Sequence, residues 1–125
     1  MSIATCSDTW TSLAGADPVL SDDASLDAAV ALYAERADWT NPYVSPVYGD
    51  FSKGYPPTLL QVGTKERLLS DSVRLYQAPK GAGREVLLDV YEGMPHVFQG
   101  YMHESPEQAT ALAELGYVGF ALDMY

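Results

Sequence analysis

The sequence predicts an α/β fold organised around a strand–helix–strand unit. Two short apolar runs, residues 58–63 (TLLQVG) and 85–93 (EVLLDVYEG), are rich in aliphatic side chains and end at glycine, as buried strands commonly do. Residues 71–79 lie between them and carry apolar side chains at helical spacing, and we expect Pro79 and the glycines of KGAG, residues 80–83, to end this helix. Strands joined by one helix pair in parallel through a right-handed crossover.

The composition is that of one small acidic domain. The chain has 125 residues, 47% of them hydrophobic, which is enough for a core. Because 17 acidic residues outnumber 7 basic ones, the net charge of −10 argues against binding of nucleic acid or of an anionic membrane surface. No apolar run is long enough for a membrane span, and no secretory signal is visible, so we expect a cytoplasmic protein. A single cysteine, Cys6, cannot form an internal disulfide.

The N-terminal half is predicted to hold one helix between irregular segments. Residues 1–24 are polar and are expected to form a loop. Residues 25–36 (SLDAAVALYAER) follow capping residues and place Val30 and Tyr33 on an apolar helix face. Residues 37–57 contain four prolines and two glycines, which exclude a regular element. The aromatic side chains of that segment either pack as a surface loop or line part of a pocket: Trp39, Tyr43, Tyr48, Phe51 and Tyr55.

A last helix is predicted after the second strand. Ser105 is expected to be its N-cap and Pro106 its first helical residue, with Gln108 completing a capping box. Gly116 suits the position just past the helix end. Two parallel strands are too few for a stable sheet, so the sequence also predicts that further strands complete it.

Titratable side chains follow both predicted strands at the same edge of the sheet. Ligands and catalytic groups of parallel α/β sheets lie beyond the carboxyl ends of the strands. One such turn, residues 64–71, carries Glu66 and Asp71, and the other carries His96. Since neighbouring strands lie about 4.8 Å apart, a carboxylate from the first turn can meet the imidazole of the second and fix its tautomer. His103 precedes a helix N-cap and is expected to be an ordinary exposed histidine.

Two stretches resemble a known family: SPVYGDFSKGYPPTLLQVGTKERLLSDSVRLYQA, residues 45–78, and GREVLLDVYEGMPHVFQ, residues 83–99. They are similar to the C-terminal part of α/β-hydrolase esterases of the hormone-sensitive-lipase type. Strand, acid turn, helix, strand and histidine turn match that family in order and length. The resemblance implies the C-terminal portion of an α/β-hydrolase fold, with its last parallel strands, flanking helices and an incomplete sheet.

The resemblance also implies roles for individual residues. His96 in GMPHVF is similar to the catalytic histidine of the family, whose acid lies thirty positions earlier, and here that position is Glu66. The family pattern D-x-L-x-D is replaced by ERLLSD, so Asp71 is the alternative acid and is otherwise explained as a helix-start residue. Val97 and Phe98 are expected to line the pocket or to fill the core.

Two motifs of the family are absent from the sequence. Neither the G-x-S-x-G nucleophile elbow nor an HGGG-type oxyanion loop occurs. We therefore expect residues 1–125 to be a single partial domain that lacks the N-terminal half of the fold and is inactive alone.

The function implied by the resemblance is that of a serine carboxylic-ester hydrolase, to which this chain supplies the acid and the histidine. A small-molecule ester is the implied substrate, no metal or organic cofactor is implied, and pairing of family members through the last strand and C-terminal helix suggests a homodimer. The alternative is a non-catalytic α/β module that binds a partner protein through an exposed sheet edge and the aromatic segment.

Overall fold

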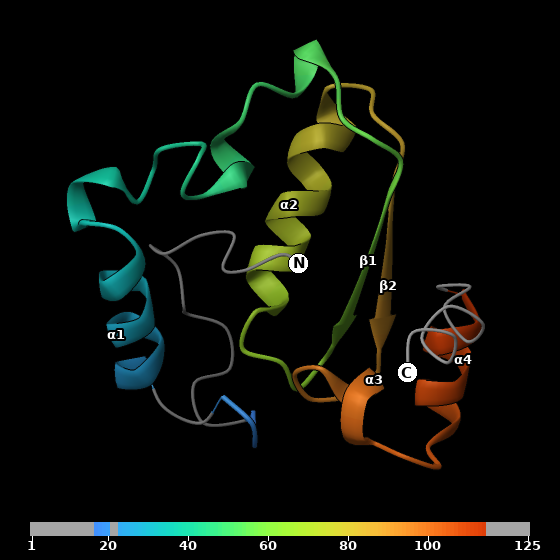
Figure 1. The fold of residues 1–125 in the computed structure, drawn as a ribbon. Coiled ribbons are helices and arrows are strands. Elements are labelled where there is room, and N and C mark those ends of the chain that lie inside the picture. Colours follow the sequence, from blue (N-terminus) through green and yellow to red (C-terminus); the bar gives the residue numbers. More distant parts are fainter. Residues whose placement is uncertain (1–16, 21–22, 115–125) are drawn as a thin grey trace, which may run out of the picture.

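A computed structural model describes residues 17–20 and 23–114 (Figure 1). Two strands, β1 (Thr58–Gly63) and β2 (Val86–Tyr91), form a parallel pair in register from Thr58 opposite Val86 to Gly63 opposite Tyr91. Both predicted strands and their parallel pairing are confirmed. Cys6 and Gly116 lie outside the described residues.

The crossover between the strands is α2 (Leu69–Gly81), which is longer than predicted at both ends. The helix ends at Gly81, as the glycines of KGAG predict, but Pro79 does not end it, because Pro79 lies within its last turn and is buried. Pro79 has no N–H to donate to the carbonyl four residues earlier, but its fixed φ is compatible with a helix. Its carbonyl accepts from the N–H groups of Ala82 and Arg84, each at 3.0 Å, and these bonds close the helix.

Helices cover the strand pair on two sides. Figure 1 views the strands nearly edge-on, with α2 on one side and α4 (Pro106–Glu114) on the other. Gln61 of β1 connects the sheet to α4, since its Nε2 donates to the Ala111 carbonyl at 3.0 Å. The buried apolar side chains that hold these layers together include Val62, Leu75, Val86, Phe98 and Ala111.

The start of α4 confirms the predicted N-cap but not the capping box. Ser105 Oγ accepts from the Gln108 N–H at 3.0 Å. The Gln108 side chain, however, donates to the Gln99 carbonyl at 2.8 Å instead of turning back to the N-cap. That carbonyl belongs to α3 (Phe98–Tyr101), a one-turn helix that the sequence did not predict. The hydrogen bond from the Gln108 side chain to the Gln99 carbonyl therefore joins α4 to α3.

The N-terminal part is joined to the sheet layers mainly through α2. It comprises α1 (Asp23–Tyr33) and three 3₁₀ turns: η1 (Arg36–Asp38), η2 (Pro46–Tyr48) and η3 (Phe51–Lys53). Arg74 of α2 donates to the Tyr48 hydroxyl at 3.1 Å, so the proline-rich segment packs on this helix.

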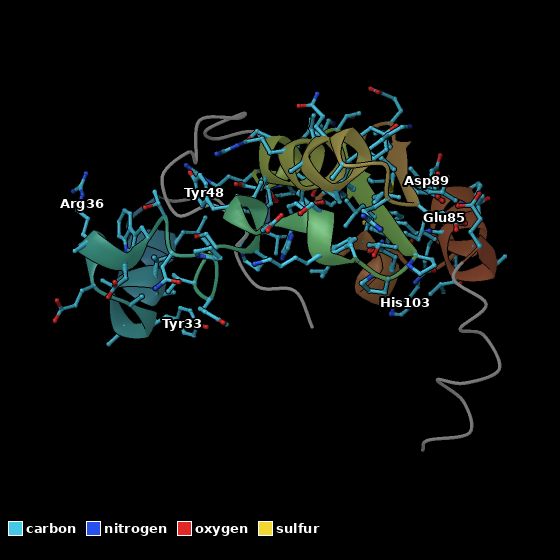
Figure 2. All side chains as sticks on the ribbon, turned by 90° about the horizontal axis from the view of Figure 1, so that it is seen from above. Tyr33, Arg36, Tyr48, Glu85, Asp89 and His103 are labelled. Carbon is cyan, nitrogen blue, oxygen red and sulfur yellow. The ribbon has the colours of Figure 1, made fainter. Side chains whose placement is uncertain are left out.

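The apolar face predicted for the first helix is only partly confirmed. Val30 is buried, but Tyr33 is 71% exposed. Figure 2 shows Tyr33 and Arg36 at the end of the molecule opposite Glu85 and Asp89. The end of α1 therefore lies far from the strand pair and is not buried against it.

Apolar side chains of β2 remain accessible in the two-stranded sheet. Leu87 is 62% and Val90 49% exposed. The sequence-based expectation that this sheet is incomplete agrees with that exposure, because parallel sheets are normally covered on both faces. Among the described residues, no helix has the length and apolar character that a bilayer crossing requires.

Candidate functional site

Two turns meet beyond the carboxyl ends of β1 and β2. We call residues 63–68 the acid turn and residues 92–97 the histidine turn. Their backbones are joined directly, because the Lys65 N–H donates to the Met94 carbonyl at 3.1 Å and the Gly93 N–H donates to Thr64 Oγ1 at 2.7 Å. These bonds set the distance between any side chains that the two turns carry.

Gly63 allows this close approach. A Cβ atom at position 63 would lie 1.8 Å from the Met94 carbonyl oxygen, far inside van der Waals contact. Glycine is also favoured at position 93, because the backbone φ there is +75°, in the left-handed region that other residues rarely adopt. Glycine at both positions therefore lets the histidine turn cross over the end of β1.

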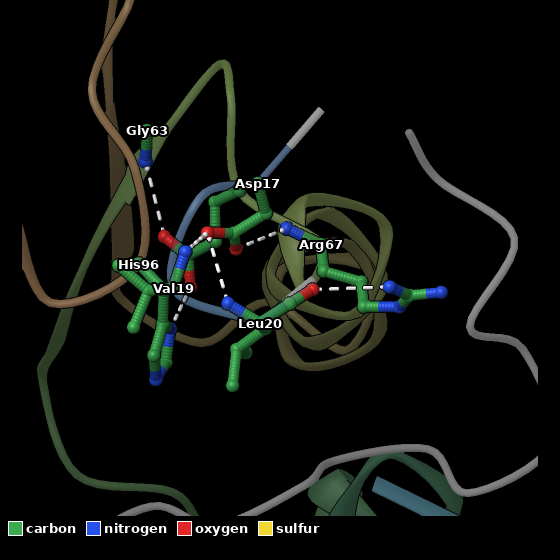
Figure 3. Close-up of polar contacts among 7 residues, drawn as sticks. Asp17, Val19, Leu20, Gly63, Arg67 and His96 are labelled. Atoms are coloured by element: carbon green, nitrogen blue, oxygen red, sulfur yellow. Dashed lines mark hydrogen bonds and ion pairs between the residues drawn. The ribbon is translucent and has the colours of Figure 1, made fainter. Parts of the chain in front are cut away.

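The two turns bring Glu66 and His96 into contact. His96 Nδ1 lies 2.7 Å from Glu66 Oε1 (Figure 3). The other oxygen, Oε2, accepts from the Gly63 N–H at 3.2 Å, and Glu66 is only 7% exposed. With both oxygens engaged, the carboxylate is oriented before any substrate arrives.

The contact also sets the charge of the imidazole. The hydrogen bond that His96 donates to Glu66 raises the pKa of His96 above its ordinary value, although partial burial opposes the shift; the negative charges of Glu66 and Asp17 add to it. In neutral His96 the proton is held on Nδ1 by this carboxylate, which leaves the lone pair on Nε2. Such an imidazole can accept a proton through Nε2 and stay stabilised as the cation.

Asp17 is a site residue that the sequence reasoning missed. It was assigned to an N-terminal loop, yet its side chain is buried and Oδ2 accepts from the Arg67 N–H at 3.0 Å. Burial works against ionisation, but hydrogen bonds from three backbone N–H groups hold the pKa of Asp17 below its usual range. No local sequence pattern links positions 17 and 67, so only the fold reveals this contact.

The other predicted site residues lie in α2, at the start of α3 and just after α3. Asp71 is buried in the first turn of α2, as expected of a helix-start residue, and the carboxylate at His96 Nδ1 is that of Glu66. Phe98 is buried with its ring centroid 5.0 Å from that of Tyr91, whereas Val97 is 52% exposed and left-handed, with φ of +49°. His103 is exposed, as predicted.

A metal is not suggested by the part of the chain that the structure describes, where no group of three or more His, Cys, Asp or Glu side chains could hold one. The two turns themselves supply a carboxylate and an imidazole in contact.

The sequence is similar to proteins described as alpha/beta hydrolases, esterases and acetyl-hydrolases. A family model described as alpha/beta hydrolase fold matches residues 3–100. The chain is 40% identical over 84 residues to an esterase of Acinetobacter venetianus, covering 67% of this chain and 27% of that protein. It is 36% identical over 98 residues to an acetyl-hydrolase of Streptomyces hygroscopicus, covering 78% and 32%.

Solved structures match the fold as well. The crystal structure of an esterase superimposes with a TM-score of 0.78 at 41% identity, covering 86% of this chain and 33% of that one. A hormone-sensitive-lipase homologue from a metagenome library gives a TM-score of 0.75 at 39% identity, covering 82% and 35%. The chain thus spans roughly a third of the length of these proteins.

Proposed function

The chain belongs to the α/β-hydrolase fold family, and on that premise we propose that Glu66 and His96 are the acid and the base of a serine carboxylic-ester hydrolase. The observation that carries the proposal is the 2.7 Å contact between Glu66 Oε1 and His96 Nδ1. The contact joins the turns that follow two neighbouring parallel strands, where α/β folds bind their ligands.

In this mechanism, His96 Nε2 takes the proton of a serine hydroxyl as the serine oxygen attacks the ester carbonyl. The imidazolium then gives the proton to the leaving alcohol, and the same two steps with water release the acid. Glu66 holds the tautomer and stabilises the imidazolium, while the Gly63 N–H fixes Glu66. A raised His96 pKa suits a base that must keep the proton until the alcohol leaves.

The serine and the oxyanion hole come, in this proposal, from a part of the protein outside the 125 residues. Two observations support it: the sequence holds no G-x-S-x-G motif, and β2 exposes Leu87 and Val90. The chain is then one portion of a larger α/β-hydrolase domain whose other strands cover those side chains. Asp71 is a helix-start residue in this account.

The proposed substrates are small carboxylic esters. The support comes from the names of the relatives, an esterase and an acetyl-hydrolase, which point to ester bonds and, in the second case, to a short acyl group.

The test is hydrolysis of p-nitrophenyl acetate by the full-length protein that contains these residues. We expect His96→Ala to lower kcat by about 10⁴-fold or more, as loss of a triad member does elsewhere. His103→Ala is the matched control, because His103 is an exposed histidine of the same chain, and it should leave kcat unchanged.

Activity that survives His96→Ala would contradict the proposal. It would favour the alternative of a module without catalytic function in these turns.

A further inference from the structure

Asp17 lies outside the strands and helices that position the Glu66–His96 pair. It lies in the short segment 17–20, fifty residues before the acid turn, and it is 1% exposed. A carboxylate this deeply buried must be stabilised by hydrogen bonds to remain charged. Among the described residues, it accepts from three backbone N–H groups: Arg67 at 3.0 Å on Oδ2, and Val19 at 2.9 Å and Leu20 at 3.2 Å on Oδ1.

The contact is reciprocal. While Asp17 accepts from the Arg67 backbone, the Arg67 guanidinium donates through Nη1 to the Leu20 carbonyl at 3.0 Å, and Arg67 is itself 1% exposed. Two bonds of opposite direction therefore fasten segment 17–20 to the acid turn, as Figure 3 shows.

Arg67 directly follows Glu66, so the same bonds limit the movement of Glu66. On one side, Glu66 is held to the end of β1 by two bonds with Gly63: its N–H donates to the Gly63 carbonyl at 3.3 Å, and its Oε2 accepts from the Gly63 N–H at 3.2 Å. On the other side, the peptide group that joins Glu66 to Arg67 donates to Asp17. The acid turn is thus fixed from the sheet and from segment 17–20.

We propose that Asp17 is a positioning residue for the Glu66–His96 pair, acting by anchoring the acid turn that carries Glu66. This inference rests on the proposed function. It goes beyond it by adding a residue from a distant segment to the two that the turns supply.

The electrostatics agree with this geometry. Glu66 has the larger effect on the His96 pKa, and Asp17 raises it further; in return, the histidine lowers the pKa of Asp17. Among the described residues, Glu66 from the acid turn and Asp17 from segment 17–20 each raise the His96 pKa. A second carboxylate here stabilises the imidazolium that forms during the reaction.

The experiment compares Asp17→Asn with the unchanged full-length protein. Asparagine removes the charge, and its amide places an NH₂ group where one of the two carboxylate oxygens accepted. We expect kcat for p-nitrophenyl acetate to fall roughly 10- to 100-fold with little change in KM, because the reacting geometry and not substrate binding is disturbed. The acidic limb of the kcat/KM profile should move to lower pH, as should the His96 titration followed by NMR.

Two further variants make the result decisive. Asp50→Asn is the matched control, because Asp50 also accepts from a backbone N–H two residues on, that of Ser52 at 3.1 Å, but at the start of η3. It should change neither kcat nor the His96 titration. Asp17→Glu keeps a carboxylate and should restore the His96 titration towards that of the unchanged protein.

A purely structural role predicts another pattern. In that case Asp17→Asn would lower the unfolding temperature but leave the His96 pKa and kcat of the folded protein unchanged, and the inference would be overturned. The NMR titration does not depend on catalysis, so it separates this failure from a failure of the proposed function, which is judged by His96→Ala.

Discussion

The carboxyl edge of the sheet and the face covered by α4 each bring a carboxylate to a second titratable group, with different consequences. At the edge, Glu66 meets a base, and their hydrogen bond raises the pKa of His96. On the α4 face, burial raises the pKa of Asp89, and the like charge of Glu114 raises it further. The Tyr91 hydroxyl donates to Glu114 in the same cluster, and its pKa is raised by burial and by that contact.

The difference lies in what each arrangement favours. The edge pair favours separated charges, an imidazolium beside a carboxylate, whereas the α4 face favours protonation of one of two acids. The edge is also fixed by backbone N–H groups, those of Gly63 on Glu66 and of Arg67 on Asp17. The pKa of a titratable group is shifted at both places, so a shift alone does not identify a site; the pairing of an acid with a base at a strand end does.

Among changes to the carboxylates, the largest effect should come from Glu66→Gln. The Gly63 N–H needs an acceptor, which draws the glutamine oxygen to it and turns the NH₂ group toward His96 Nδ1. The imidazole would then carry its proton on the wrong nitrogen, and we expect kcat to fall by about 10⁴-fold. Ester hydrolysis by the folded variant measures this.

Asp71→Asn is the comparison for that variant, because Asp71 is the other acid of the same sequence stretch. It should change kcat by less than about 10-fold, whatever its effect on unfolding, because Asp71 lies in the first turn of α2 and the carboxylate at His96 is that of Glu66. The reverse ranking of the two variants would assign the acid to Asp71.

Gly63→Ala should be the most destabilising single change at the edge. The added methyl overlaps the Met94 carbonyl, so the two turns must separate, and we expect a loss of at least about 3 kcal/mol in the free energy of unfolding. Gly81→Ala, at the end of α2 with nothing within 4 Å of the new Cβ, should be neutral or slightly stabilising. Chemical denaturation measures both, and equal losses would disprove the close approach of the turns.

Stability should depend on pH through His96 in a defined direction. Because the folded pKa is raised, the stabilisation is fully present below the unfolded value of about 6.5 and is lost as pH rises through the folded pKa. The gap in unfolding temperature between the unchanged protein and His96→Ala should therefore be larger at about pH 6 than at about pH 9. A gap that grows with pH, or one that His103→Ala reproduces, would be inconsistent with the pair.

The smallest effect is expected on the α4 face. Asp89→Asn removes a carboxylate whose charged form is disfavoured there, so it should stabilise the protein by about 0.5 kcal/mol at neutral pH. The gain should vanish as pH falls and Asp89 becomes protonated. Thermal unfolding at neutral pH and at acidic pH measures this difference. A loss of stability in the variant at neutral pH would mean that the Asp89 charge is favourable.

The sequence predicted what local patterns and the strand order determine. TLLQVG forms β1 with the predicted bounds, and the rule that parallel strands end at one edge placed Glu66 and His96 in neighbouring turns. It could not predict contacts made by tertiary packing. The Gln108 side chain donates to a carbonyl of α3 instead of completing the capping box, and Asp17 accepts from a backbone N–H fifty residues away. Pro79 lies inside the last turn of α2 although proline is an unfavourable helix residue, and local propensity alone does not predict this.

The central claim is that Glu66 and His96 work as one unit, and a double-mutant cycle tests it most directly. Glu66→Gln, His96→Ala and the double variant are compared by kcat for p-nitrophenyl acetate in the full-length protein. If Glu66 acts through the imidazole, the double variant should be no slower than His96→Ala alone, since no histidine remains to be oriented. Losses that multiply, with Glu66→Gln still costing its full factor in the absence of His96, would contradict the account.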